Sequence, residues 1–200
     1  MIKHVSLLLS LLISFTANSN TLLIIGDSLS AGYNMTVEES WPEFLPEKLQ
    51  QQGLDLTVIN ASISGDTSGN GLARLPALLT KHQPDYVLLE LGANDGLRGF
   101  SPKIVNNNLS VMIDNIKSQN TKTILMQIQV PPNYGKRYSK AFSELYPALS
   151  KQKGISLIPF FLEEVITKPE WMQKDGLHPN AKAQQWIAEY IAKELKKIIK

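Results

Sequence analysis

Two spacings of hydrophobic residues alternate along the chain. Short, nearly continuous apolar runs are typical of strands buried on both faces, whereas an apolar residue every three or four positions is typical of a helix packed on one side. The sequence predicts strands over residues 21–25, 56–59, 86–91, 123–130 and 155–160. It predicts helices over residues 41–52, 70–81, 102–118 and 139–151, and from 179 to the C-terminus.

Strands and helices that alternate in this way form a parallel sheet with helices on both of its faces. The sequence contains no internal repeat, no low-complexity stretch and no linker rich in Pro, Gly or Ser. We therefore expect residues 20–200 to form one α/β domain, a three-layer α/β/α sandwich around a five-stranded parallel sheet.

The N-terminal segment differs from the rest of the chain. Lys3 and His4 precede an apolar run over residues 5–13, and the small residues Ala17 and Ser19 follow it. This order is typical of a secretory signal peptide, and the run is shorter than the roughly 20 residues that span a bilayer. We expect residues 1–19 to be a signal peptide and the remainder to be periplasmic or secreted, without a stable membrane anchor. The alternative is a buried first helix.

Composition and charge exclude several classes of protein. A chain of 200 residues that is 43% hydrophobic and 19% charged suits a folded globular domain. Its 20 basic and 18 acidic residues are mixed, without the basic excess of nucleic-acid-binding proteins. The sequence has no cysteine and only three histidines, which excludes thiolate chemistry and argues against a histidine-rich metal centre. We expect no metal, no organic cofactor, no nucleic-acid partner and a monomeric chain.

Polar and glycine residues gather where the predicted strands end. Gly-Asp-Ser-Leu follows the first strand at 26–29, and Asn-Ala-Ser-Ile-Ser-Gly-Asp follows the second at 60–66. Gly-Ala-Asn-Asp-Gly follows the third at 92–96, and Asp-Gly-Leu-His lies beyond the fifth at 175–178. Ligands of open α/β sheets bind at the edge where parallel strands end. We therefore expect these four segments to converge on one site.

The residue types in these segments suit acyl transfer by a serine nucleophile. A serine hydroxyl needs a base to take its proton, and histidine is the side chain matched to neutral pH. Only His178 of the three histidines lies near the expected edge, and Asp175 can orient its ring from the same loop. Because Pro179 suits the first position of a helix, we expect His178 to lie at a helix start.

An oxyanion hole needs hydrogen-bond donors aimed at the developing negative charge. The backbone amides of Ser28 and Gly65 and the side-chain amide of Asn94 can supply them. Each residue also has a purely structural interpretation. Ser28 and Asn94 can cap a helix or a turn, and Gly65 can serve a turn that needs positive φ. Likewise, Asp175 and His178 can be ordinary loop residues.

Apolar and aromatic residues follow the third and fourth predicted strands. Leu97, Phe100, Tyr134 and Tyr138 lie in connections that pass over the expected site. They can line a groove for an acyl chain, or they can pack in the core. We treat Leu97, Phe100 and Tyr134 as candidate substrate-binding residues.

The polar segments resemble the sequence blocks of the SGNH hydrolase family, also called the GDSL family. Residues 26–30, Gly65, residues 92–95 and residues 175–178 are similar to its first, second, third and last blocks. The resemblance covers essentially the whole chain after the predicted signal peptide. Longer runs at 26–33, 60–67, 94–100, 132–135 and 175–179 are similar to periplasmic members that act on acyl-CoA thioesters, lysophospholipids and aryl esters.

This resemblance implies a flavodoxin-like three-layer fold and a serine esterase or thioesterase that forms an acyl-enzyme intermediate. It implies a triad of Ser28, Asp175 and His178, and an oxyanion hole of Ser28, Gly65 and Asn94, with no metal and no cofactor. Two alternatives remain. The same triad could deacylate carbohydrates, or the chain could be an inactive carrier of fatty chains, which would need no triad.

Overall fold

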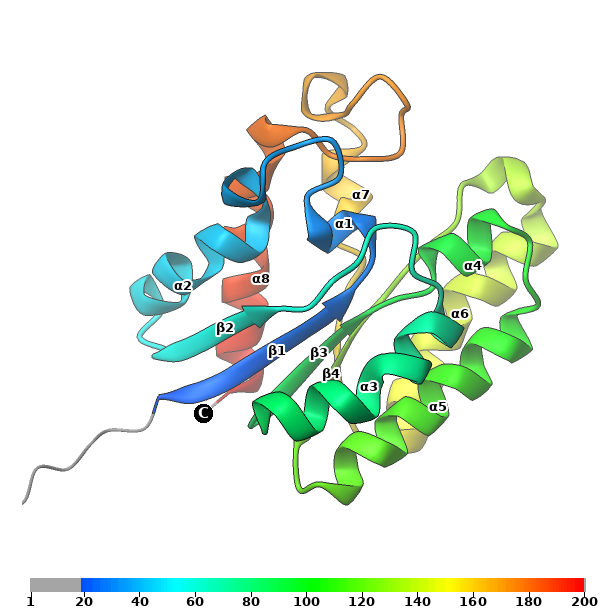
Figure 1. Cartoon of the computed structure of the whole chain (residues 1–200). Helices are drawn as coiled ribbons and strands as arrows, with labels where there is room; N and C mark the ends of the chain where they lie inside the picture. Colours follow the sequence, from blue (N-terminus) through cyan, green and yellow to red (C-terminus); the bar gives the residue numbers. More distant parts are fainter. Residues whose placement is uncertain (1–18, 200) are drawn as a thin grey trace, which may run out of the picture.

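A five-stranded parallel sheet forms the centre of the molecule (Figure 1). The structure is a computed structural model that describes residues 19–199. Its strand order is β2-β1-β3-β4-β5, so β1 lies between β2 and β3. The strands are β1 (Asn20–Gly26), β2 (Leu56–Asn60), β3 (Tyr86–Glu90), β4 (Lys122–Met126) and β5 (Ser156–Ile158).

Helices cover both faces of the sheet (Figure 1). One face carries α2 (Trp41–Gln51) and α8 (Ala181–Ile198), which pack against each other, and the other carries α3 (Ser68–His82), α5 (Pro102–Ser118) and α6 (Lys136–Lys153). This arrangement confirms the predicted three-layer α/β/α sandwich. Shorter elements complete the chain: α1 (Ser28–Ala31), α4 (Ala93–Leu97), α7 (Leu162–Val165) and the 3-10 turns η1 (Val37–Glu39), η2 (Pro132–Tyr134) and η3 (Pro169–Trp171).

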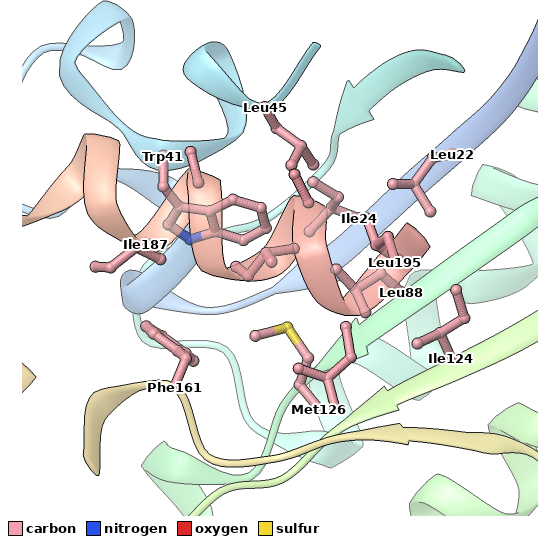
Figure 2. Packing of buried hydrophobic residues seen from close by; sticks show 14 of the residues in the cluster. Leu22, Ile24, Trp41, Leu45, Leu88, Ile124, Met126, Phe161, Ile187 and Leu195 are labelled. Atoms are coloured by element: carbon pink, nitrogen blue, oxygen red, sulfur yellow. The ribbon is translucent and has the colours of Figure 1, made fainter. Parts of the chain in front are cut away.

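The sheet separates two hydrophobic cores because successive strand residues point to opposite faces. Leu22 and Ile24 of β1 pack towards α2 and α8, as Figure 2 shows, and Leu23 and Ile25 pack towards the other helices. Each of these side chains is fully buried, and burial of a side chain of this size contributes about 1.5–3 kcal/mol. Trp41 is fully buried too, and its indole Nε1–H donates to the carbonyl oxygen of Leu29, 3.1 Å away. The core therefore holds the segment after β1 in place.

The strands next to the site end earlier than the sequence predicts. The apolar run that predicts a strand to residue 130 leaves the sheet after Met126, and β5 stops at Ile158 instead of residue 160. Gln127 N–H still donates to the Ile158 carbonyl oxygen at 2.9 Å, but Pro159 has no N–H to extend the ladder. The apolar residues that follow are therefore free of the sheet.

The last helix begins later than predicted. Asn180 is its N-cap and accepts a hydrogen bond from Lys182 N–H at 3.0 Å, so α8 starts at Ala181. Pro179 instead pairs with Met172 in an isolated antiparallel bridge. The prediction that His178 lies at a helix start is therefore wrong, because Asn180 caps the helix two residues later and leaves His178 in a loop.

The predicted signal peptide, residues 1–19, lies outside the described residues except for Ser19. Among residues 19–199, no helix is both long enough and apolar enough to cross a membrane.

Candidate active site

The turn between β1 and α1 presents Ser28 at the edge where the strands end. Asp27 caps α1, because its Oδ1 accepts the Leu29 N–H at 3.1 Å. Ser28 Oγ lies 2.8 Å from His178 Nε2, although the two residues are 150 positions apart in sequence. The sheet edge and the loop after η3 thus bring the predicted nucleophile and the predicted base into hydrogen-bond contact.

Asp175 holds the other side of the imidazole. Its Oδ2 lies 2.7 Å from His178 Nδ1, and its Oδ1 accepts the backbone N–H groups of Leu177 and His178 at 2.9 and 3.0 Å. Partial burial opposes ionisation, but the hydrogen bonds from the His178 and Leu177 N–H groups and from the imidazole outweigh it and lower the pKa of Asp175. A charged Asp175 favours the proton on Nδ1, which leaves Nε2 to accept the Ser28 hydroxyl proton.

Gly65 and Asn94 line the same cavity as Ser28. Gly65 has φ +86°, a conformation that favours glycine, in the turn after β2. Asn94 lies in the first turn of α4, and its Nδ2 donates to the Asp66 carbonyl oxygen at 3.0 Å and to Asp27 Oδ2 at 3.2 Å. The structure therefore brings together the three residues predicted to form the oxyanion hole.

The cavity has a volume of about 570 Å³, within the usual range for small-molecule sites. Leu97 lines it, but Phe100 and Tyr134 are not among its lining residues. Tyr134 instead donates its hydroxyl to the carbonyl oxygen of the lining residue Leu97 at 3.0 Å. Most of the apolar lining was not singled out from the sequence: Leu29, Ile128, Val130, Phe160, Leu162, Ile166 and Leu177.

A family model described as GDSL-like lipase/acylhydrolase matches residues 24–186. The chain belongs to this family. The match contains every residue of the cavity, from Ser28 to His178.

Relatives of this GDSL-like lipase/acylhydrolase match over nearly their whole length. An arylesterase of Vibrio mimicus is 60% identical over 198 residues, which cover 98% of this chain and 99% of that protein. The thioesterase 1/protease 1/lysophospholipase L1 of Escherichia coli K12 is 52% identical over 197 residues, or 98% and 93% of the two chains. The crystal structure of the psychrotrophic esterase EstA from Pseudoalteromonas sp., inhibited by monoethylphosphonate, has a TM-score of 0.86 and 46% identity and covers 90% of this chain and 98% of that one. Together with the family, these relatives confirm the prediction of an ester or thioester hydrolase.

Two signals could have located the missed lining residues of this GDSL-like hydrolase. Ile128 and Val130 belong to the apolar run predicted as the end of the fourth strand, and Phe160 to the end of the fifth. Pro159 directly follows β5 and lacks the N–H that would extend the ladder, and Pro131 ends the apolar run that continues past β4. Within the described part of the chain, no group of three or more His, Asp or Glu side chains is arranged to hold a metal ion.

Two buried carboxyl groups, those of Asp27 and Glu90, belong to or contact the turn between β1 and α1 that carries Ser28. Asp27 and Glu90 are fully buried, and Glu90 Oε2 accepts the Ser30 hydroxyl at 2.7 Å and the Asp27 N–H at 3.3 Å. A Cβ on Gly26 would approach Glu90 Oε2 to 2.6 Å, so glycine at this position leaves room for the Glu90 carboxyl group. Burial raises the pKa of Asp27 to about 7, and burial together with nearby Asp27 raises the pKa of Glu90 well above its ordinary value.

These raised pKa values predict how stability depends on pH. Above pH 3.8, the ordinary pKa of Asp27, the folded state binds more protons than the unfolded chain. The contribution of Asp27 and Glu90 to the free energy of unfolding therefore falls as pH rises from about 4 through 7. Glu90→Gln keeps an oxygen acceptor but cannot ionise. We expect its free energy of unfolding to exceed that of the wild type at pH 8 by on the order of 1–3 kcal/mol, with a smaller difference at pH 5.

Urea unfolding between pH 5 and pH 9 measures this difference. Glu163→Gln, at an exposed position of α7, is the matched control and should keep the wild-type slope. A Glu90→Gln difference that is constant with pH would show that Glu90 does not ionise in this range.

Proposed function

We propose that the protein is a serine esterase and thioesterase in which Ser28 is the nucleophile, His178 the general base and acid, and Asp175 the residue that orients the imidazole. One observation carries the proposal. Asp175, His178 and Ser28 form a continuous hydrogen-bonded chain, 2.7 and 2.8 Å between successive partners, that ends at an apolar cavity. This is the arrangement that activates a serine hydroxyl for attack on an acyl carbon.

Acylation begins when His178 Nε2 takes the Ser28 proton while Oγ bonds to the carbonyl carbon of the substrate. The carbonyl oxygen becomes an oxyanion, which the backbone N–H groups of Ser28 and Gly65 and the Asn94 amide stabilise. As the tetrahedral intermediate collapses, the bond to the leaving group breaks. The imidazolium of His178 returns its proton to a leaving alkoxide. A thiolate can leave without it, and His178 then releases the proton to solvent or to the thiolate before deacylation.

Deacylation uses the same groups in reverse. His178 takes a proton from water, the resulting hydroxide attacks the acyl carbon, and the oxyanion hole again stabilises the intermediate. Collapse releases the carboxylic acid as Ser28 Oγ recovers the proton from His178. Each catalytic cycle therefore consumes one water and needs no other reactant.

We propose acyl-CoA thioesters, lysophospholipids and aryl or fatty-acyl esters as substrates. The names of the Vibrio mimicus and Escherichia coli relatives support this range, as does a cavity lining that includes eight leucine, isoleucine, valine and phenylalanine side chains. We propose also that residues 1–19 are removed during export to the periplasm or the medium and that the mature chain is a monomer. N-terminal sequencing and light scattering on the exported protein test these two points.

A panel of substrates tests the proposed activity. The purified protein is assayed against an acyl-CoA, a lysophospholipid, an aryl ester, an acetylated sugar and a peptide ester, with Ser28→Ala as the inactive control. We expect turnover of the first three. Hydrolysis of the acetylated sugar alone would favour a carbohydrate esterase, and binding of fatty acids without any hydrolysis would favour a carrier.

The apolar cavity predicts how rate depends on acyl length. Each methylene that enters it should contribute up to about 0.8 kcal/mol, or about fourfold in kcat/KM, until the cavity is full. We expect kcat/KM to rise from acetyl to medium-chain aryl esters and then to level off. Leu97→Ala and Phe160→Ala should flatten this rise and leave acetyl ester hydrolysis little changed, because both side chains line the cavity.

Phe100→Ala is the matched control, since Phe100 is exposed and outside the lining. A steady-state series of aryl esters from acetyl to dodecanoyl provides the measurement. If acetyl esters are the best substrates and neither cavity variant alters the profile, the cavity does not bind the acyl chain.

A further inference from the structure

Ser28 and His178 belong to two separate segments of the chain that also contact each other through Gln173 and Tyr33. His178 belongs to a loop, residues 172–179, that is closed at its base by the bridge between Met172 and Pro179 and by a hydrogen bond of 2.8 Å from Gln173 N–H to the His178 carbonyl oxygen. The Asp175–His178 contact lies wholly inside this loop. These internal contacts therefore do not by themselves fix how far the loop lies from Ser28.

The side chain of Gln173 joins this loop to the segment that follows the nucleophile. Its Nε2 donates to the Tyr33 carbonyl oxygen at 2.8 Å and to the Pro179 carbonyl oxygen at 3.0 Å. Its Oε1 lies 3.5 Å from Asn34 Nδ2, at the end of the same segment. One amide thus contacts the residue that directly follows His178 and two residues a few positions after Ser28.

Tyr33 adds a second contact between the same two segments. Its ring lies 4.5 Å from the His178 ring, centroid to centroid, with an angle of 35° between the planes. The carbonyl that Gln173 holds belongs to this same tyrosine. The amide therefore fixes the backbone from which the Tyr33 ring reaches the imidazole.

We propose that Gln173 is a positioning residue that sets the Ser28–His178 distance, an inference that rests on the proposed serine mechanism. Its two N–H donors point to two carbonyl oxygens, one of Tyr33 in the segment after Ser28 and one of Pro179 in the His178 loop. A carboxylate of the same shape has no donor and would repel both carbonyls. A shift of about 1 Å in a reacting group can cost on the order of 100-fold in rate.

Gln173→Glu and Gln173→Met test this role, because both side chains resemble glutamine in length and neither provides the two donors. We expect kcat per active site, counted by phosphonate titration, to fall 10- to 100-fold in both variants, with KM within about twofold of the wild type. The downfield NMR resonance of the His178 Nδ1 proton should persist, because Asp175 moves with the loop. Lys174→Ala, the next and exposed position, is the matched control and should keep the wild-type kcat.

A purely structural role would lower the melting temperature or the fraction of titratable sites and leave kcat per site unchanged. Wild-type kcat per site in both Gln173 variants would overturn the inference. Failure of both variants to fold would also overturn it, because a residue that only positions the triad is not needed for folding. The proposed function is judged separately by Ser28→Ala. An active Ser28→Ala variant would contradict the serine mechanism itself, whatever the Gln173 variants do.

Discussion

Ser28→Ala and His178→Ala are each expected to lower kcat by about 10⁴- to 10⁶-fold, as losses of a serine nucleophile or its base do in other hydrolases. Ser28 Oγ and His178 Nε2 lie 2.8 Å apart, and in the proposed mechanism they share one proton transfer. Once either is absent the other has no partner, so the double variant should be little worse than either single variant. Steady-state kinetics with an aryl ester measure all three.

The control for this comparison is His82→Ala, because His82 ends α3 and lies away from the cavity. It should retain wild-type kcat. Losses that multiply in the double variant would show that Ser28 and His178 act independently, which contradicts a shared triad.

Asn94→Ala is expected to lower kcat by about 100- to 1000-fold, or about 2.7–4 kcal/mol of transition-state stabilisation, as for the loss of one oxyanion donor elsewhere. Its amide is held by the Asp66 carbonyl oxygen at 3.0 Å and, at the longer distance of 3.2 Å, by Asp27 Oδ2. In the proposed mechanism, a developing oxyanion competes for one of these N–H groups, and Asn94→Ala removes that donor.

The same aryl ester assay separates kcat from KM for this variant. Asn108→Ala is the matched control, since Asn108 donates to Ser68 Oγ at 2.9 Å and does not line the cavity. It should affect stability more than kcat. A change in KM alone would make Asn94 a substrate-binding residue instead of an oxyanion donor.

The hydrophobic pattern was sufficient to predict the sheet and its layers. The three central strands β1, β3 and β4 contain runs that are buried on both faces, as in residues 22–25 of β1, whereas the edge strands β2 and β5 are only partly buried. Such runs, separated by helical patterns, predict a parallel sheet with helices on both sides. The ends of elements were predicted less well. The apolar run to residue 130 continues past the sheet because the side chains that line the cavity are as apolar as those of the core.

The polar site was predictable for a topological reason, since Ser28, Gly65 and Asn94 follow strands that end at one edge. Which aromatic side chains face the cavity was not predictable, because the orientation of Phe100 and Tyr134 depends on how two loops pack. Tyr134 turns its hydroxyl to the Leu97 carbonyl oxygen, a contact that no spacing in the sequence indicates.

The contacts of Gln173 and Glu90 were not predicted from the sequence either. Gln173 binds backbone carbonyls, which every residue possesses, so no pairing of residue types marks its partners. Glu90 is different. An acid inside a predicted apolar strand, directly before the Leu-Gly that leads to Asn94, is the signal that could have identified a buried carboxyl group near the site.

The most direct test of the serine mechanism is covalent labelling by an alkyl phosphonate ester that reacts with activated serines, followed by mass spectrometry of the digested protein. We expect one phosphonyl adduct per chain, located on Ser28, and loss of esterase activity in proportion to labelling. The His178→Ala variant should label far more slowly, because the Ser28 hydroxyl then lacks its base. Complete inhibition with the adduct on another residue, or undiminished esterase activity in a fully labelled protein, would contradict the assignment of Ser28 as the nucleophile.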